Sequence, residues 1–405
     1  MNWDFLIKDK ESLSVSTDTR NLPAGCVYFA LRGETFDGNK FAKQALESGA
    51  SLAVIDNPEY ALPEGTLLVP NTLLALQDLA RAWRRELGLP IIGITGTNGK
   101  TTTKELMATV LSTKYNIHYT QGNLNNQIGV PLTLLQITRA HEMAIVEMGA
   151  SHPGDIKELV DIAEPNYGLI TNVGRAHLQG FGSFEGVQQT KRELYDYLVA
   201  HDGTIFRNAD NPYLEKMLLS ACENSKFKIQ NSKLYTTGVM PSGTNLVGSY
   251  NAENVSAAMC VGEHFGIARE QALEAIRQYV PTNKRSQFMQ TPKNKLVVDA
   301  YNANPTSMFA SINAFEGDTF ILGEMKELGD YAHLEHQNIV NMLAERKATQ
   351  VYLVGKEWMQ TTAPYACFQD VAELREFILS HPIQNAHILL KGSRGVQLEK
   401  IIDLL

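Results

Sequence analysis

The run GITGTNGKTTT at residues 93–103 constrains this chain more than any other segment. It follows an apolar, strand-like segment at 90–95 and opens a helix-like segment at 100–112, so glycines and backbone amides fall where a strand turns into a helix. Backbone N–H groups and the positive end of a helix dipole attract anionic oxygens, and glycines let the main chain approach them closely. The pattern therefore predicts a phosphate-binding loop in an α/β protein.

The residues of this loop have separate predicted roles. Lys100 adds a positive charge, and the Thr101 hydroxyl is placed to hold Mg2+ beside the phosphates. The generic pattern requires glycine at position 94, where this chain has Ile94, so the match is to a variant form, TGTNGKTT. A glycine-rich turn that binds no nucleotide is the alternative. The predicted nucleotide-binding residues are Gly96, Thr97, Asn98, Gly99, Lys100, Thr101 and Thr102.

Chain length and apolar patterning predict three α/β domains. At 405 residues the chain is too long for one core. Short apolar runs alternate with amphipathic helical patterns, which is typical of parallel sheets covered by helices on both faces. The last such helix is expected at 396–404. We predict a small N-terminal α/β domain (1–88), a central P-loop ATPase-type parallel sheet (89–281) and a C-terminal Rossmann-like domain (282–405).

Composition argues against several classes of protein. The net charge of −8 argues against a general binder of nucleic acid or of anionic membranes, because these need clustered cations. The 4 cysteines are scattered with no CxxC pair, which is typical of reduced thiols in the cytosol. No run reaches the roughly 18 apolar residues of a membrane span, and the N-terminus does not resemble a signal peptide. We expect a cytoplasmic monomer without a membrane span.

Polar residues follow predicted strands of the central domain. Glu147 ends an apolar strand that would lie beside the phosphate-loop strand, and His177 follows a third strand. Parallel sheets place their sites at the carboxyl ends of strands, so we expect Glu147 to reach a Mg2+ held by Thr101 and His177 to bind metal. The alternative for Glu147 is a cap of the next segment. Lys191 lies on a predicted helix, where position alone favours a solvated surface lysine.

A polar segment, DAYNANP at 299–305, joins a strand to a helix in the C-terminal domain. The helix would begin at Pro305, a residue suited to the first helical position. Capping would explain only one of the polar residues. Asp299, Asn302 and Asn304 are therefore candidates for contact with ribose, base or substrate across an interdomain cleft.

Two further features of this domain allow competing interpretations. The segment KGSRG at 391–395 ends the last strand with two cations, which fits either an anion site or a charged loop. His333 and His336 have helical spacing but no third ligand nearby, so we expect them on an exposed helix face.

Taken together, these segments resemble the Mur ligase superfamily of ATP-dependent amide-forming enzymes, and the resemblance covers essentially the whole chain. Nine matches in the same order are far more specific than any single one. They are STDTR (16–20), ALRGETFDGNKFAKQAL (30–46), TGTNGKTTTKE (95–105), GNLNNQIGVPLTLL (122–135), VEMGASHPGDI (146–156), TNVGRAHLQGFGS (171–183), DAYNANPTSM (299–308), LGEMKELGD (322–330) and LKGSRG (390–395).

The resemblance implies both an architecture and a reaction. The implied architecture is an N-terminal domain for a uridine nucleotide, a central ATPase domain and a mobile Rossmann-like C-terminal domain. The implied reaction uses ATP and two Mg2+ ions to join D-alanyl-D-alanine to UDP-N-acetylmuramoyl-tripeptide through an acyl phosphate, in peptidoglycan precursor synthesis. It further implies that Lys191 is carbamylated and ligates the second Mg2+ with Glu147 and His177, which replaces the surface interpretation of this lysine.

The resemblance also implies roles for other residues. Asn251 and Asn254 would lie near the adenine, and Arg285 near the γ-phosphate, where it would act with Lys100. The nucleotide or acyl acceptor would lie near Asp299, Asn302 and Asn304. The family more often has histidine at the position of Asn39, so a role that requires histidine there does not carry over to this chain. The implied substrate-binding residues are Thr17, Asp18, Arg20, Arg32, Asn125 and Asn126.

Other functions make different demands on the sequence. A sibling ligase that adds the third amino acid typically carries a DNPR motif, which this chain lacks. Folylpolyglutamate synthetase shares the phosphate loop but should lack DAYNANP and GNLNNQIGVPLTLL. A P-loop kinase or nucleotide switch would need no Rossmann-like third domain with polar strand ends. The third residue of the tripeptide, lysine or diaminopimelate, stays open.

Overall fold

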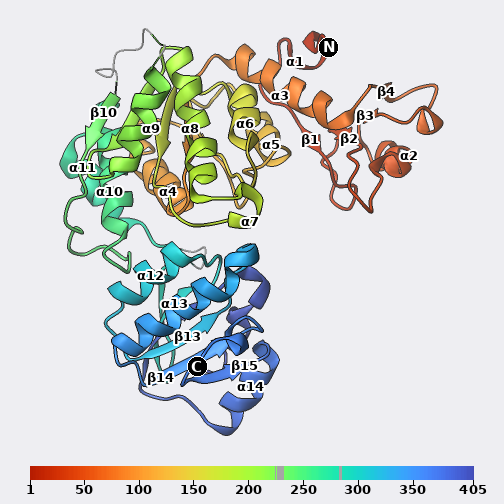
Figure 1. Ribbon diagram of the computed structural model, residues 1–405. Helices are drawn as coiled ribbons and strands as arrows, with labels where there is room; N and C mark the ends of the chain where they lie inside the picture. The colour runs from red at the N-terminus through yellow and green to blue at the C-terminus, as the bar shows by residue number, and fades with distance from the viewer. Residues whose placement is uncertain (224, 226–231, 282–284) are drawn as a thin grey trace.

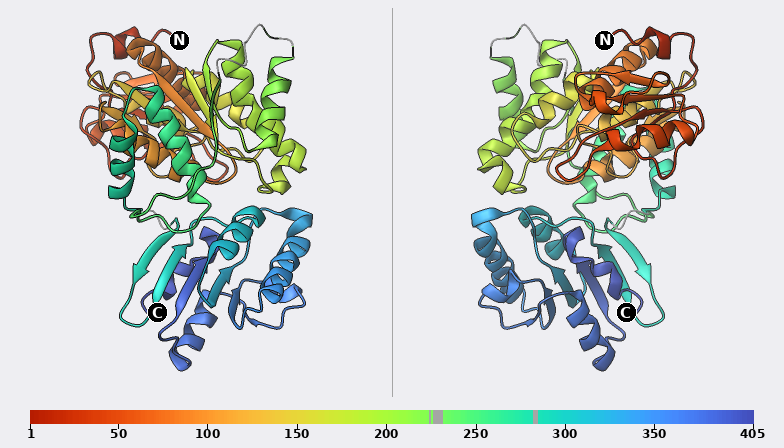
Figure 2. Two further views of the ribbon diagram at one scale, coloured as in Figure 1. Left: turned by 90° about the vertical axis from the view of Figure 1, so that its left-hand side faces the viewer. Right: turned by 90° about the vertical axis from the view of Figure 1, so that its right-hand side faces the viewer.

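The computed structural model describes residues 1–223, 225, 232–281 and 285–405. The described residues form three sheets with flanking helices, which confirms the predicted α/β class with three domains (Figure 1). The N-terminal domain lies beside the central domain and the C-terminal domain lies below it (Figures 1 and 2). Domain boundaries at 88 and 281 stay predictions. Among the described residues, no helix is long and apolar enough to cross a membrane.

The N-terminal sheet is parallel, with strand order β1-β2-β3-β4. Helix α3 (Thr72–Leu87) is capped at its N-terminus by Asn71, whose side chain accepts a hydrogen bond from Leu74 N, and at its C-terminus by Gly88, where φ is +63°. This helix packs against the central domain, and Trp83 Nε1 donates a 2.9 Å hydrogen bond to Ile137 O. One hydrophobic cluster therefore runs through both domains. The other elements are α1 (Asp4–Ile7), β1 (Val15–Ser16), β2 (Val27–Phe29), η1 (Gly38–Phe41), α2 (Ala42–Glu47), β3 (Leu52–Ile55), η2 (Pro58–Tyr60) and β4 (Thr66–Leu68).

The central sheet is parallel, with strand order β10-β9-β8-β5-β7-β6. Strand β5 lies between β7 and β8, so the three strand ends that carry the predicted site are neighbours. Separate hydrophobic clusters cover the two faces. The strands are β5 (Ile91–Thr95), β6 (Ile117–Tyr119), β7 (Met143–Glu147), β8 (Tyr167–Ile170), β9 (Thr204–Asn208) and β10 (Ser232–Tyr235). The helices are α4 (Lys100–Leu111), α5 (Gly129–Leu135), α6 (Asp155–Ala163), α7 (Leu178–Phe181), α8 (Phe184–Ala200), α9 (Pro212–Cys222), α10 (Asn251–His264) and α11 (Arg269–Gln278).

The C-terminal sheet has strand order β11-β12-β16-β13-β14-β15, with β11 antiparallel to β12 and the other pairs parallel. Its strands are β11 (Gln287–Gln290), β12 (Lys295–Asp299), β13 (Thr319–Gly323), β14 (Gln350–Val354), β15 (Ala366–Phe368) and β16 (His387–Lys391). Its helices are α12 (Pro305–Ala314), η4 (Gly329–Tyr331), α13 (Ala332–Glu345), η5 (Trp358–Gln360), α14 (Val371–Ser380), η6 (Arg394–Val396) and η7 (Leu398–Ile401).

Two predictions for the C-terminal domain are wrong. The helix expected at 396–404 is replaced by η6 and η7, because Gln397 adopts a left-handed conformation with φ of +61° between them. His333 is exposed as expected, but His336 is buried. The His336 Nε2 accepts a hydrogen bond from Met325 N at 3.0 Å, and Nδ1 bonds to Ala332 O. His336 is therefore a hydrogen-bonded part of the domain core, and burial lowers its pKa.

Candidate active site between the central and C-terminal domains

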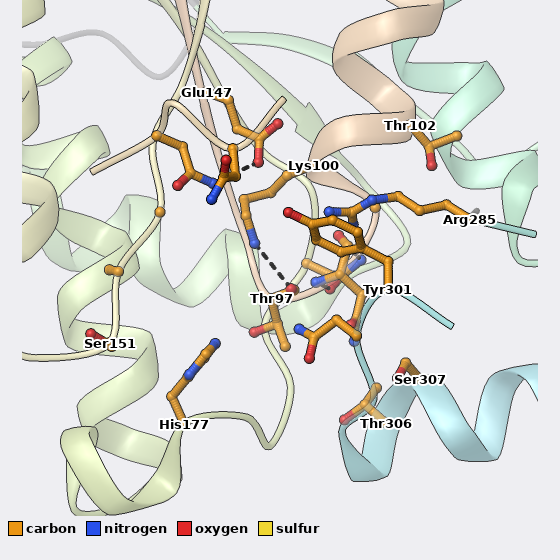
Figure 3. A pocket seen from close by; sticks show the side chains of 18 of the residues that line it. Thr97, Lys100, Thr102, Glu147, Ser151, His177, Arg285, Tyr301, Thr306 and Ser307 are labelled. Atoms are coloured by element: carbon orange, nitrogen blue, oxygen red, sulfur yellow. Dashed lines mark hydrogen bonds between the residues drawn. The ribbon is translucent and has the colours of Figure 1, made fainter. Parts of the chain in front are cut away.

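A cavity of about 940 Å3 lies between the central and C-terminal domains. The phosphate loop and the ends of β7 and β8 form one wall, and the segments that follow β12 and β16 form the other. Figure 3 shows Lys100, Arg285 and Tyr301 close together on this cavity, with Thr306 and Ser307 at the start of α12 nearby. The carboxyl ends of parallel strands therefore face a second domain, which is the usual place for a ligand site in such sheets.

The phosphate loop has the geometry of an anion cradle. Gly96 and Gly99 have φ of +142° and +79°, and a Cβ on Gly96 would lie 2.0 Å from Thr171 Oγ1. Lys100 Nζ folds over the turn and donates to the carbonyl oxygens of Gly96 and Thr97 at 2.7 and 3.2 Å. Burial lowers the Lys100 pKa to about 8, and the charge of Glu147 opposes this shift. Tight glycines, a helix N-terminus and a lysine amine fit a bound phosphate.

Glu147 is the centre of a buried polar cluster at the end of β7. Thr101 Oγ1 donates to Glu147 Oε2 at 3.0 Å, and Asn125 Nδ2 donates to Oε1 at 3.0 Å. Lys104 Nζ lies 3.5 Å from Oε2, and both side chains are at most 2% exposed. Burial raises the Glu147 pKa, but Lys104 and Lys100 outweigh it and the net shift is downward. An ionised carboxylate beside a threonine hydroxyl suits a hard cation.

This cluster decides between the two interpretations of Glu147 and adds a residue, Lys104, that was not predicted. Gly154, not Glu147, caps the next helix, α6, so the capping alternative for Glu147 does not apply. Lys104 was missed, although helical periodicity indicates it: it lies four residues after Lys100 and three after Thr101, on the same face of α4.

His177 lies on the cavity wall in a left-handed conformation with φ of +50°, just before α7. Its Nδ1 is paired with a carboxylate of the C-terminal domain, Glu327. Glu327 was not predicted as a site residue. This pairing lowers the Glu327 pKa. The residue expected to bind metal therefore contacts the facing domain directly.

Lys191 is buried on α8, with only 2% of its surface exposed. The interpretation of Lys191 as a solvated surface lysine is therefore wrong. Burial first, and the charge of Lys100 second, lower its pKa well below the usual value. Its Nζ lies 5.6 Å from the ring centroid of Phe181 and has no hydrogen bond or ion pair among the described residues. Both effects favour the neutral amine over the ammonium ion.

The expected metal ligands do not form a conventional cluster of acidic and histidine side chains. Within the described ranges, no group of three or more His, Cys, Asp and Glu residues could hold a metal ion. Thr101 and Glu147 are in direct contact, and His177 lines the same cavity. The fourth expected ligand, Lys191, would supply oxygen only after carbamylation. With a carbamylated Lys191, the four side chains offer the oxygen and nitrogen donors that could hold Mg2+.

The residues expected near adenine continue the phosphate-loop wall of the cavity. Thr103 Oγ1 donates to Asn254 Oδ1 at 3.0 Å, and Asn254 Nδ2 donates to Asn251 Oδ1 at 2.8 Å. Asn251 in turn donates to Val247 O at 2.7 Å. Helix α10 is thereby tied to α4, and both asparagines line the cavity.

The polar strand-end residues of the C-terminal domain have different partners. Asp299 Oδ2 pairs with the buried Lys391 Nζ at 2.5 Å, so one cation of the KGSRG segment is already neutralised. Asn304 caps α12 in a capping box with Ser307. Asn304 Nδ2 also donates to Asn98 Oδ1 of the phosphate loop at 2.8 Å. Asn302 lines the cavity.

The loop that carries His177 connects the two walls of the cavity, and Arg285 lies on the cavity beside Tyr301. The Arg285 guanidinium lies 4.0 Å from the ring centroid of Tyr301, an aromatic residue that the sequence interpretation did not single out. Arg175 pairs with Glu335 of α13 at 2.9 Å, and Arg175 N donates to Thr306 Oγ1 at 3.1 Å. The domains are therefore in direct polar contact beside the cavity.

The expected substrate residues divide into two groups. Asn125 and Asn126 line the cavity. Thr17, Asp18, Arg20 and Arg32 belong to the N-terminal domain and do not line it. Asp18 and Arg20 form an exposed pair at 2.6 Å, and Arg32 pairs with Asp56 at 2.8 Å.

Asn39 has a structural role in the N-terminal domain. Its Nδ2 donates to Asp37 and Asp56 at 2.8 and 2.9 Å, and the residue is fully buried. It therefore holds Asp56, the partner of Arg32, in place.

Comparison with known proteins identifies the family. Family models match the chain in order: the Mur ligase family catalytic domain at 13–84, the Mur ligase middle domain at 94–262 and the Mur ligase glutamate ligase domain at 284–394. UDP-N-acetylmuramoyl-tripeptide--D-alanyl-D-alanine ligase from Bacillus subtilis strain 168 is 34% identical over 96% of this chain and 92% of the relative. The protein of the same name from Escherichia coli strain K12 is 31% identical over 97% and 93%. The chain belongs to the Mur ligase family.

Solved structures share the fold over almost the whole chain. MurF from Acinetobacter baumannii has a TM-score of 0.84 at 29% identity and covers 96% of this chain and 92% of its own. MurF ligase from Thermotoga maritima, solved in complex with ADP, has a TM-score of 0.84 at 24% identity, with 98% of each chain covered. The three-domain arrangement is thus that of known Mur ligases.

Proposed function

We propose that this protein is an ATP-dependent ligase that joins D-alanyl-D-alanine to UDP-N-acetylmuramoyl-tripeptide in peptidoglycan precursor synthesis. The observation that carries the proposal is the interdomain cavity, where a phosphate loop with Lys100 faces the polar strand ends of a second domain. Relatives that bear this enzyme name match over nearly the full chain. We expect the enzyme to act in the cytoplasm as a monomer.

The chemical problem is to bring a carboxylate up to ATP, since the two anions repel each other. Lys100 and Arg285 supply positive charge on the cavity wall. Mg2+ held at Thr101 and Glu147 would neutralise negative charge there and so lower this repulsion. The terminal carboxylate of the tripeptide attacks the γ-phosphorus of ATP and forms an acyl phosphate, and ADP leaves. The dipeptide amine then attacks the acyl carbon, phosphate leaves, and the nitrogen loses a proton as the amide forms. The facing C-terminal domain would exclude water from the acyl phosphate.

The metal ligands of this proposal are Thr101, Glu147, His177 and a carbamylated Lys191, for two Mg2+ ions. Support for the carbamate comes from burial of the Lys191 amine and its lowered pKa. The amine nitrogen would add to CO2, form an N–C bond and lose a proton, which leaves an anionic oxygen donor.

The substrates can be tested by release of inorganic phosphate. We expect D-alanyl-D-alanine to stimulate phosphate release only when UDP-N-acetylmuramoyl-tripeptide is present, because the acyl phosphate must form before an amine can attack it. Free D-alanine or glutamate should not replace the dipeptide. Tripeptides that end in lysine and in diaminopimelate should be assayed side by side, since the site residues do not indicate which of the two side chains is bound.

The opposite result would change the assignment. Stimulation by glutamate with a folate acceptor would move the protein to folylpolyglutamate synthesis. Phosphate release at the same rate with and without each added amine would indicate a kinase or a nucleotide switch instead.

A further inference from the structure

The lysine and arginine side chains that line the cavity are not equivalent. Among the described lining residues these are Lys100, Arg285, Lys391 and Arg394. Lys100 lies in the phosphate loop, and Lys391 is neutralised by Asp299. The charge of Arg285 acts on both Lys100 and Glu147, which places Arg285 on the phosphate side. Arg394 differs from all three, because it has no ion pair or side-chain hydrogen bond within the described part of the chain.

Arg394 projects from a loop that is held firmly. A Cβ on Gly392 would lie 2.9 Å from Gly323 Cα, so this turn is packed closely against the end of β13. Ser393 Oγ accepts a hydrogen bond from Lys326 N at 3.1 Å. The Arg394 guanidinium lies 5.7 Å from the ring centroid of Tyr301, and the Arg285 guanidinium contacts the same ring. An exposed arginine on a fixed loop is thus directed along the cavity wall.

Two guanidinium groups therefore lie beside the Tyr301 ring. That of Arg285 is on the side of the phosphate loop, and that of Arg394 is on the side of the loop that follows β16. An extended dipeptide spans about 7 Å, at roughly 3.5 Å a residue. Its amine must reach the acyl phosphate, so its carboxylate must lie away from the phosphate loop. A planar guanidinium binds a carboxylate through two parallel hydrogen bonds.

We propose that Arg394 binds the C-terminal carboxylate of the dipeptide acceptor and so selects the free acid. The inference rests on the proposed function, because it concerns the acceptor of that reaction. It makes Arg394 a specificity-determining residue, whereas Arg285 serves the phosphates.

The test compares two acceptors that differ in one charge, D-alanyl-D-alanine and D-alanyl-D-alanine amide. Phosphate release is measured at saturating ATP and UDP-N-acetylmuramoyl-tripeptide for the unmodified enzyme and for Arg394→Ala. The unmodified enzyme should prefer the acid, and Arg394→Ala should raise the KM for the acid by about 10- to 100-fold, as expected for loss of a hydrogen-bonded charge. The variant should use acid and amide nearly equally, and its KM values for ATP and the nucleotide substrate should not change.

Two further variants sharpen the result. Arg394→Lys keeps the charge but not the paired hydrogen bonds, so its KM should be intermediate. Lys356→Ala removes an exposed cation of the same domain that does not line the cavity, and its kinetics should match those of the unmodified enzyme.

Several outcomes would overturn the inference. One is an unmodified enzyme that uses acid and amide equally, a result that needs no variant to fold. Another is an unchanged preference for the acid in Arg394→Ala. A rise in the KM for ATP or for the nucleotide substrate alone would assign Arg394 to a phosphate. If the unmodified enzyme shows no dipeptide-dependent phosphate release, the proposed function itself fails and this inference fails with it.

Discussion

Lys100→Ala is expected to lower ATP turnover by about 10³-fold, as for loss of one preorganised cationic donor in a shielded site. Lys100 Nζ is the positive group that closes over the phosphate loop, where it now donates to two loop carbonyls. Burial lowers its pKa to about 8, and a bound phosphate beside it should favour the charged form.

The fold should survive this change. The two hydrogen bonds lost are local to the loop, so the free energy of unfolding should fall by only about 1 kcal/mol. Thermal unfolding measures that effect, and Lys114→Ala, an exposed lysine beyond the other end of the same helix, is the matched control. Near-normal turnover in a folded Lys100→Ala protein would contradict the phosphate-loop assignment.

Lys191→Ala should be inactive, with turnover reduced about 10³-fold or more, and short carboxylic acids should restore part of the activity. The substitution removes the amine that would carry the carbamate and leaves space in a buried site. Acetate or formate in that space would return the missing oxygen donors. The unmodified enzyme should also lose activity when CO2 is removed from the buffer and regain it with bicarbonate.

Lys191→Met is the control for the rescue, because it fills the space with an apolar chain of similar size. Added acetate should not help it. Phosphate release with and without each acid measures the effect, and thermal unfolding reports whether each variant folds. Full activity of Lys191→Ala, or high-resolution density for an unmodified amine, would exclude the carbamate.

Much of the secondary structure near the site could be predicted because its causes are local. The apolar run predicted at 90–95 forms β5 (Ile91–Thr95), and α12 begins at Pro305 as predicted. The apolar pattern at 396–404 predicted one helix, but the left-handed backbone of Gln397 separates the segment into η6 and η7. The exposed position predicted for His336 was also wrong, because spacing along a helix does not say which face another element will cover.

The sequence alone determined that a phosphate loop joins a strand to a helix, that two further strands end in Glu147 and His177, and that sheets and helices alternate in three domains. Only the tertiary structure decided which polar groups meet. Lys104 pairs with Glu147, Asn98 with Asn304, and Arg175 with Glu335. Apolar periodicity along a helix or strand indicates which of its faces is apolar, because the residues of one face recur at a fixed spacing in the sequence. Pairings between distant residues depend on strand order and on how the domains pack, and no local pattern encodes either.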